Sequence, residues 1–222
     1  MKNIFIISIL LFAGKNSFSQ EAPAPSASGK KMDVGVTLGY GLPMGGDFGK
    51  YYSGALLYDL SLGYKINSGF GVSVGGEYGK FALKNTSSYI ADKQDQIVAD
   101  QYAPPYTELV GGGIRVIAVH AEAKKIFMPE AKTKFSVMAG PSLSFLEKSP
   151  VDGTDSTGTY QILRHYVHEK PFGVNVGGGI EHEFSQSFSV MLAVRYKMLL
   201  TSQVQDKMMG IVAIQLGCAV KF

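Results

Sequence analysis

Apolar and polar residues alternate with a period of two along most of the chain. In the stretch 34–42, valine, leucine and tyrosine occupy every second position, and glycine or threonine occupies the positions between them. This alternation predicts strands with one apolar and one polar face. Most of the segments that follow it are about as long as the ten residues that a tilted strand needs to cross a membrane. The segments are residues 34–42, 56–65, 70–79, 108–127, 134–145, 172–184, 188–198 and 209–222.

The connections between these eight segments alternate between short and long. The short ones are 67–69, 128–133 and 185–187, and the long ones are about 43–54, 82–105, 147–170 and 199–209. Tight periplasmic turns and extended external loops are typical of antiparallel outer-membrane barrels, and an even strand number puts both termini on the periplasmic side. The pattern therefore predicts an all-β fold, an eight-stranded antiparallel up-and-down transmembrane β-barrel in the outer membrane.

Composition agrees with a barrel that has a lipid-facing wall. The chain has 27 glycines, and they fall mainly on the polar faces, because the interior of a small barrel is crowded. Several aromatic residues fall near strand ends, where they would form interfacial girdles. These residues are Tyr40, Tyr64, Phe70, Phe135, Phe184, Phe188 and Phe222. A soluble β-barrel, whose apolar faces would meet one another, is the alternative.

The N-terminal residues 1–20 are predicted to be a signal peptide that is removed. Lys2 is followed by an apolar stretch over 4–13 and then by small and polar residues, and this stretch is too short to span a bilayer as a helix. A buried helix is the alternative. Residues 21–31, rich in proline, alanine and serine, are predicted to be a flexible periplasmic leader. Residues 32–222 would form the barrel.

Charge and cysteine content exclude some classes of partner. Without Lys2 and Lys15, the mature chain would have 19 basic residues against 18 acidic ones, a net charge of +1. Nucleic-acid binding needs a concentrated basic face, so no nucleic-acid partner is expected. Cys218 is the only cysteine and cannot form an internal disulfide. An exported chain of this kind must therefore gain its stability from a continuous hydrogen-bonded structure.

Seven of the charged residues on the faces predicted to point into the barrel could form a charged network. Paired carboxylates beside a base would suit acid–base catalysis. However, small barrels fill their interior with side chains, and buried charges there must be paired, so we interpret these residues as a structural network in the lumen. They are Glu77, Glu122, Glu181, Glu183, Lys124, Arg195 and Lys197. No catalytic, cofactor-binding or metal site is predicted.

Two loop segments have some features of metal sites. Residues 164–170 contain His165 and His168, but a metal site normally needs three or four ligands, so a solvated loop is favoured. Residues 151–158 resemble a calcium loop in their Asp, Gly and Ser content but lack the distal acidic ligand. A mobile loop is the expected structure there.

One pair of residue types is compatible with lipid hydrolysis. Some small outer-membrane barrels use a Ser/His pair on the strand surface to hydrolyse lipid A. The nearest candidate here is His182 with Ser185 or Ser187. Their spacing does not require such a function.

The chain ends in "LGCAVKF", with apolar residues alternating up to a terminal aromatic. This ending, together with residues 138–145 and 177–198, resembles the eight-stranded outer-membrane barrel families. These are the OmpA/OmpX-like barrels and especially the PorT-like "outer membrane protein beta-barrel domain" proteins of Bacteroidota. The resemblance covers about residues 32–222. It implies that the barrel-assembly machinery reads the chain end, with Gly217, Cys218, Val220 and Phe222 at the matching positions.

These observations predict a non-enzymatic outer-membrane barrel with a plugged lumen. It would contact outer-membrane lipid through its wall, and a protein partner through that wall or the loops 82–105 and 147–170. The PorT-like resemblance implies service in a secretion or assembly complex, although one scaffold hosts many roles. The alternatives are a lipid-modifying enzyme that depends on a histidine such as His182, and a small-solute binder or channel whose plugging depends on Glu122 or Arg195. No cofactor is expected.

Overall fold

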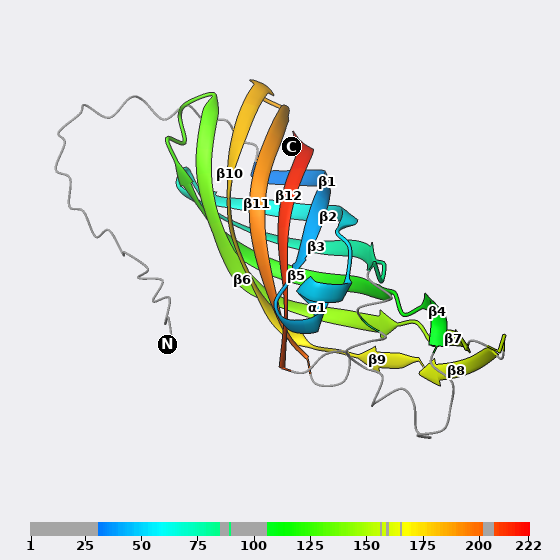
Figure 1. The fold of residues 1–222 in the computed structure, drawn as a ribbon. Coiled ribbons are helices and arrows are strands. Elements are labelled where there is room, and N and C mark those ends of the chain that lie inside the picture. The colour runs from blue at the N-terminus through cyan, green and yellow to red at the C-terminus, as the bar shows by residue number, and fades with distance from the viewer. Residues whose placement is uncertain are drawn as a thin grey trace, which may run out of the picture.

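The computed structural model describes residues 31–84, 89, 106–155, 157–158, 160–164, 166–201 and 207–222. The predicted signal peptide, residues 1–20, and all of the predicted leader except Lys31 lie outside the described residues. Within them, no helix is long and apolar enough to span a bilayer. Figure 1 shows long, strongly tilted strands that wrap around a common axis.

Eight antiparallel strands form a closed ring, which confirms the predicted fold. Each strand pairs with the next one in the order given below, and the last pairs with the first, so the ring has no free edge. Closure pairs the backbone groups of every strand, as hydrocarbon requires. The strands are β1 (Met32–Met44), β2 (Ala55–Asn67), β3 (Phe70–Phe81), β5 (Ile114–Phe127), β6 (Thr133–Lys148), β10 (Phe172–Ser185), β11 (Phe188–Thr201) and β12 (Lys207–Lys221).

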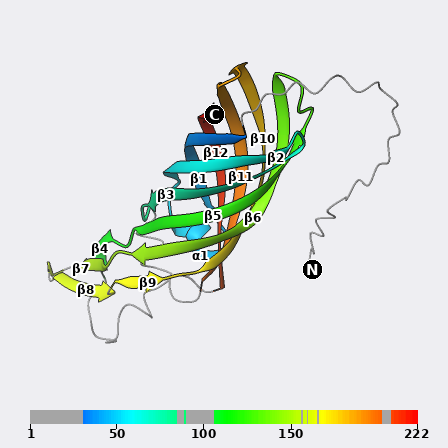
Figure 2. The ribbon, with the colours of Figure 1, turned by 180° about the vertical axis from the view of Figure 1, so that it is seen from behind.

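The remaining elements lie at the long-loop end. A short helix, α1 (Gly46–Tyr51), follows β1, and β9 (Val167–Glu169) pairs with the end of β6. A separate three-stranded sheet has the order β4 (Tyr106–Gly111), β7 (Val151–Asp155) and β8 (Tyr160–Arg164). Figures 1 and 2 show this sheet extending beyond the rim of the barrel.

Two predictions for this region are wrong in detail. The segment 108–127 was predicted to be one strand, but β4 ends at Gly111 and β5 begins at Ile114. Gly111 and Gly112 have φ angles of 91° and 69°, a backbone region that glycine adopts without the steric cost that other residues incur, so they break the ladder between the two strands. Residues 151–158, predicted to be a loop, begin with β7, which pairs with β4 and β8.

The apolar faces of the strands point outward and the polar faces inward. Val36 and Leu60, for example, are 55% and 58% exposed, whereas Thr37 and Asp59, their neighbours in sequence, are 3% exposed. The aromatic residues predicted near strand ends are all exposed on the outer wall. A wall of this kind is stable against lipid rather than water.

The chain end completes the ring. The Phe222 N–H donates to the carbonyl oxygen of Met32 at 2.9 Å, and the Met32 N–H donates to the carbonyl of Phe222 at 3.2 Å. The Phe222 ring is 55% exposed on the outer wall. The terminal aromatic therefore points outward from the wall, while its backbone is fixed to the start of β1.

Candidate functional site in the barrel interior

Four charged or titratable side chains meet near the middle of the barrel. His120 Nε2 lies 2.7 Å from Asp59 Oδ2 and His120 Nδ1 lies 3.6 Å from Glu122 Oε1. The Arg195 guanidinium bridges the same two carboxylates, at 3.6 Å from Asp59 and 3.3 Å from Glu122. The strands β2, β5 and β11 supply these residues, so the cluster joins distant parts of the ring. We call it the central cluster.

A second ion pair lies beside the central cluster. Lys197 Nζ donates to Glu77 Oε1 at 2.5 Å, and Gln215 Nε2 donates to the other carboxylate oxygen at 3.4 Å. The Lys197 and Glu77 side chains are 6% and 5% exposed. Two charges this deeply buried need each other, because an isolated buried charge is costly.

Closer to the short-turn end, lysines and glutamates alternate around the inner wall. Glu181 accepts from Lys124 at 3.1 Å and lies 2.6 Å from Lys221. Glu183 contacts Lys221 as well and lies 2.6 Å from Lys134. These five residues come from β5, β6, β10 and β12. The resulting chain of ion pairs links half of the ring at this level.

A cavity of about 480 Å³ lies below the central cluster. Its lining extends from Glu122 and Arg195 to turn residues such as Ser68 and Glu130, so it reaches the short-turn end. Small residues of β2 and β3, including Ser61 and Ser73, form part of its wall. The cavity is therefore polar and faces the side that in outer-membrane barrels is periplasmic.

At the long-loop end the interior is apolar. Phe48 of α1 is fully buried, and its ring lies 5.0 Å from that of Phe81 and 5.4 Å from that of Tyr52. We call these residues and their buried apolar neighbours the apolar cluster. Its members are Phe48, Tyr51, Tyr52, Ala55, Leu57, Phe81, Tyr89, Ile114, Val116, Leu146, Val151, Leu199, Met209, Ile211 and Ala213.

The seven charged residues singled out in the sequence all lie inside the barrel, but they form three groups rather than one. Glu122 and Arg195 belong to the central cluster, and Glu77 pairs with Lys197. Lys124, Glu181 and Glu183 belong to the chain of pairs near the short turns. Sequence reasoning missed their partners: Asp59, His120, Lys134 and Lys221. The alternation of inward and outward positions along each strand (strand parity) places these residues inward too. It does not show how far apart two side chains lie across the barrel.

The other candidates lie outside the interior. His182 is exposed, and its Nδ1 lies 2.8 Å from Thr133 Oγ1 rather than beside a serine. Ser185 Oγ accepts the N–H of Ser187 at 3.2 Å. His168 is exposed and stacks on Tyr166, and His165 lies outside the described residues.

The residues of the predicted assembly signal divide between the two faces. Cys218, Val220 and Phe222 are exposed on the outer wall. Gly217 is packed against β1, where a Cβ atom would lie 2.5 Å from Thr37 Cγ2 and from the Val36 carbonyl oxygen. Close packing alone therefore accounts for a glycine at this position.

No family model matches the chain, and no curated protein matches it either. Solved structures of small barrels do. Neisserial surface protein A (NspA) is 15% identical, with a TM-score of 0.53 over 86% of this chain and 97% of that chain. The N-terminal β-barrel domain of Pseudomonas aeruginosa OprF is 13% identical, with a TM-score of 0.49 over 87% and 99%. The outer membrane protein OprG of the same organism is 9% identical, with a TM-score of 0.48 over 87% and 97%.

At these identities the likeness concerns the fold. An exposed apolar wall on all eight strands agrees with that fold, since a wall of this kind belongs in lipid. Sorting of the connections into short turns at one end and long loops at the other gives the barrel its orientation. The chain is a small eight-stranded β-barrel of the outer membrane.

Proposed function

We propose that this protein is a non-enzymatic component of the outer membrane that does not conduct solutes and that binds a protein partner at its long-loop end. The sheet β4-β7-β8, which extends beyond the rim of the barrel, is the observation on which the proposal rests (Figure 2). The sheet adds Val151 to the apolar cluster, but its part beyond the rim adds little to the wall. Its position suits contact with another molecule.

The interior supports the absence of conduction. Eight strands leave an interior just wide enough for side chains. Here the apolar cluster would close the long-loop end, because its residues are all less than 5% exposed. Below it, the central cluster and the pair of Glu77 with Lys197 would present fixed charges to any solute. A solute would therefore have to displace both layers.

The sheet β4-β7-β8 offers two kinds of contact. Within the described part of the chain, β4 and β8 each pair only with β7, so each has an outer edge that could accept a further strand. Val110 of β4 is 59% exposed, which gives an apolar contact on the same element. Backbone pairing with an apolar anchor is a common mode of protein recognition.

Site-specific photocrosslinking in native outer membranes tests the proposal. A photoreactive amino acid at Val110 should give one discrete crosslinked species, to be identified by mass spectrometry through a tag in the leader. The same amino acid at Leu192, which is 49% exposed on the lipid-facing wall, is the matched control. Recovery of the uncrosslinked barrel from both variants would contradict the proposal.

A more specific role is implied by the resemblance to PorT-like proteins. A PorT-like protein would serve a secretion or assembly complex, and the crosslinked partner would then be one of its subunits. Recognition of Gly217, Cys218, Val220 and Phe222 by the barrel-assembly machinery is a further part of that proposal. Phe222→Ala, which keeps the backbone hydrogen bonds with Met32, should lower the amount of barrel in the outer membrane of cells while leaving refolding in detergent unchanged.

A second candidate function is favoured by the cavity at the short-turn end. Arg195 lines it, and its Nε has no hydrogen-bond partner among the described residues. A small polar solute entering from the periplasm would meet the part of the Arg195 side chain that lines the cavity; this side chain is 12% exposed, although its Nε is buried. Calorimetric titration of the detergent-solubilised barrel with periplasmic extracts would separate this function from the first.

The lipid-modifying alternative would instead require loss of lipid hydrolysis in His182→Ala.

A further inference from the structure

Charged side chains are rare on the outer wall. Among the outward positions of the eight barrel strands in the described residues, only four are charged. They are Lys80 on β3, Arg115 and Lys125 on β5, and Glu147 on β6. Charges on this face are costly at the middle of a bilayer but cost little near its interfaces. Their positions therefore mark the two levels at which the wall leaves hydrocarbon.

Arg115 and Lys125 give the spacing of these levels. They are ten residues apart on one strand, which is about 33 Å along the strand and about 25 Å along the barrel axis at a tilt of about 40°. That is the height of the apolar band of an outer-membrane barrel. Arg115 thus lies at the boundary of the leaflet on the long-loop side, and Lys125 lies at the opposite boundary.

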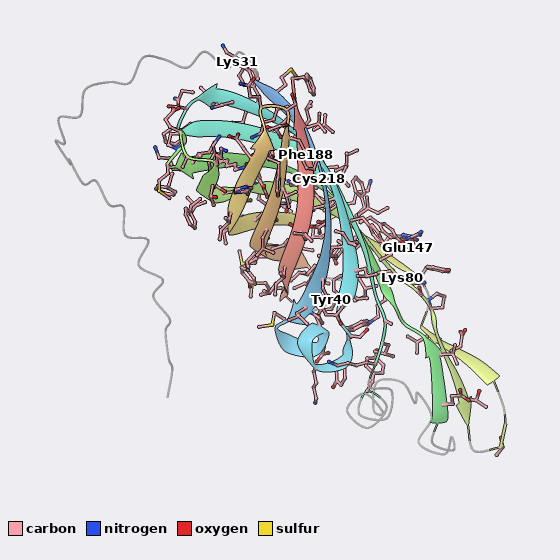
Figure 3. All side chains as sticks on the ribbon, turned by 90° about the horizontal axis from the view of Figure 1, so that it is seen from above. Lys31, Tyr40, Lys80, Glu147, Phe188 and Cys218 are labelled. Carbon is pink, nitrogen blue, oxygen red and sulfur yellow. The ribbon has the colours of Figure 1, made fainter. Side chains whose placement is uncertain are left out.

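Two cations face each other at the long-loop boundary. Lys80 lies directly opposite Arg115 in the register of β3 and β5, and Arg115 lies opposite Glu147 in the register of β5 and β6. Figure 3 shows Lys80 and Glu147 on the outer surface near the end of the barrel from which β4 extends. Side chains directly opposite on one face have their Cβ atoms about 5 Å apart, and like charges in that arrangement destabilise each other. An anion between them would remove the repulsion.

Glu147 neutralises only one of the two cations. It contacts Nη2 of Arg115, which leaves other N–H donors of the guanidinium available. Lys80 is exposed and has no ion pair with a described residue. Lys80, Arg115 and Glu147 form a row across neighbouring strands. The next residue in this row is His168, which lies opposite Glu147 on β9 and is also exposed. The row therefore has a surplus of positive charge at its Lys80 end.

Tyrosine side chains lie one outward position closer to the middle of the wall than Lys80 does. Tyr58 and Tyr78 are outward-facing cross-strand neighbours whose ring centroids are 6.5 Å apart, and Tyr78 precedes Lys80 by two residues on the same face. Tyrosines are favoured at the headgroup level of a membrane. Cations just above such a girdle meet the phosphates of the adjacent lipids.

We propose that Lys80 and Arg115 bind the phosphate of a lipid headgroup in the leaflet on the long-loop side. The site faces lipid, and the surplus positive charge matches a headgroup whose phosphate gives it a net negative charge rather than a zwitterionic headgroup. It occupies one sector of the wall only: near the long-loop ends of β1 and β12, the paired outward residues Leu42 and Val212 are apolar. One bound lipid would therefore sit against β3 and β5.

Lipid binding to single-charge variants tests the site. The full chain in detergent is titrated with phosphatidic acid or with phosphatidylcholine of the same acyl chains, and native mass spectrometry measures the bound fraction. Lys80→Gln should weaken phosphatidic acid binding about fivefold, since one cation at a membrane surface contributes about 1 kcal/mol. Glu147→Gln should tighten it, because it removes the anion that competes for Arg115.

Lys125→Gln is the matched control. It removes the same charge from the same wall at the opposite boundary, where the ammonium lies over the Phe70 ring at 3.9 Å, and it should change the affinity less than twofold. Equal losses in Lys80→Gln and Lys125→Gln would overturn the proposal, as would equal binding of the two lipids. Displacement of phosphatidic acid by inorganic phosphate would assign the site to a free anion instead. Heat-dependent gel mobility verifies that each variant is folded.

Discussion

The ion pair of Lys197 with Glu77 is a site where a single substitution should strongly lower the free energy of unfolding. Its side chains are almost fully buried, so removal of one partner leaves an uncompensated charge. Breaking a buried pair in this way typically costs 3–5 kcal/mol. Lys197→Met should therefore lower the free energy of unfolding by about 3–5 kcal/mol, measured by circular dichroism in urea with the barrel in detergent micelles.

The double variant Lys197→Met with Glu77→Leu is the control. Replacing both charges of a buried pair with apolar groups is often neutral or stabilising, so it should recover most of the loss. A loss below about 1 kcal/mol in the single variant would show that water reaches the pair and screens it.

A substitution at Gly217 can distinguish a role in packing from a role in recognition by the assembly machinery. A Cβ atom there would lie 2.5 Å from the Val36 carbonyl oxygen, which is backbone and cannot move aside cheaply. Gly217→Ala should cost about 1–3 kcal/mol, as overpacking does, even when the purified chain refolds in detergent without any assembly factor. Gly76→Ala is the control, because its added Cβ would meet only the Ala118 oxygen, at 3.9 Å. Equal stability of the two variants would point to a role for Gly217 in assembly alone.

Strand parity in the sequence was enough to place single residues on the inner or outer face. It placed Glu77 and Arg195 inside and Val36 and Phe222 outside, where the structure has them. Partners were beyond its reach, since the contact of His120 with Asp59 depends on which strands lie near each other around a closed ring. Sequence separation gives no measure of that distance.

Among the elements, the helix α1 is predicted to have the largest effect on the free energy of unfolding. It brings Phe48 into the apolar cluster against Phe81 and Tyr52, so its docking adds buried area at the end of the barrel. Phe48→Ala should cost about 3–5 kcal/mol of unfolding free energy, the range for truncating a buried phenylalanine. Phe48→Leu, which keeps most of the volume, should cost less than about 1.5 kcal/mol. Equal effects of the two variants in urea unfolding would mean that α1 is not packed on the cluster in solution.

Element prediction failed where its signal was ambiguous. The run 108–127 continues the alternation through Gly111, and only the left-handed backbone at Gly111 and Gly112 reveals that it contains two strands. The inner faces of β5 and β12 are apolar near the long loops, with Val116 and Ile211 fully buried. Where both faces of a strand are apolar, alternation weakens, and the sequence pattern cannot show which apolar residues lie inside.

For the molecule as a whole, the proposed seal predicts how conductance responds to mutation. If charge pairing alone closed the barrel, neutralising the central cluster would open it. The apolar cluster lies between that cluster and the long-loop end, so Glu122→Gln with Arg195→Gln should remain as non-conducting as the wild type in planar bilayers. Discrete current steps in the double variant would contradict the seal and favour the channel alternative.

The proposed seal would make the barrel interior accessible from one side only. The polar cavity reaches the short turns, and the apolar cluster occupies the other end. With Cys218 replaced by serine, a cysteine at Ser73 in the cavity wall should react with a membrane-impermeant thiol reagent only from the face of a proteoliposome that displays the leader. A cysteine at Val110 should react only from the opposite face. Labelling of both positions from one face would show that the orientation is mixed. Labelling of the Ser73 position from both faces, with the Val110 position labelled from one, would show that solute passes the apolar cluster.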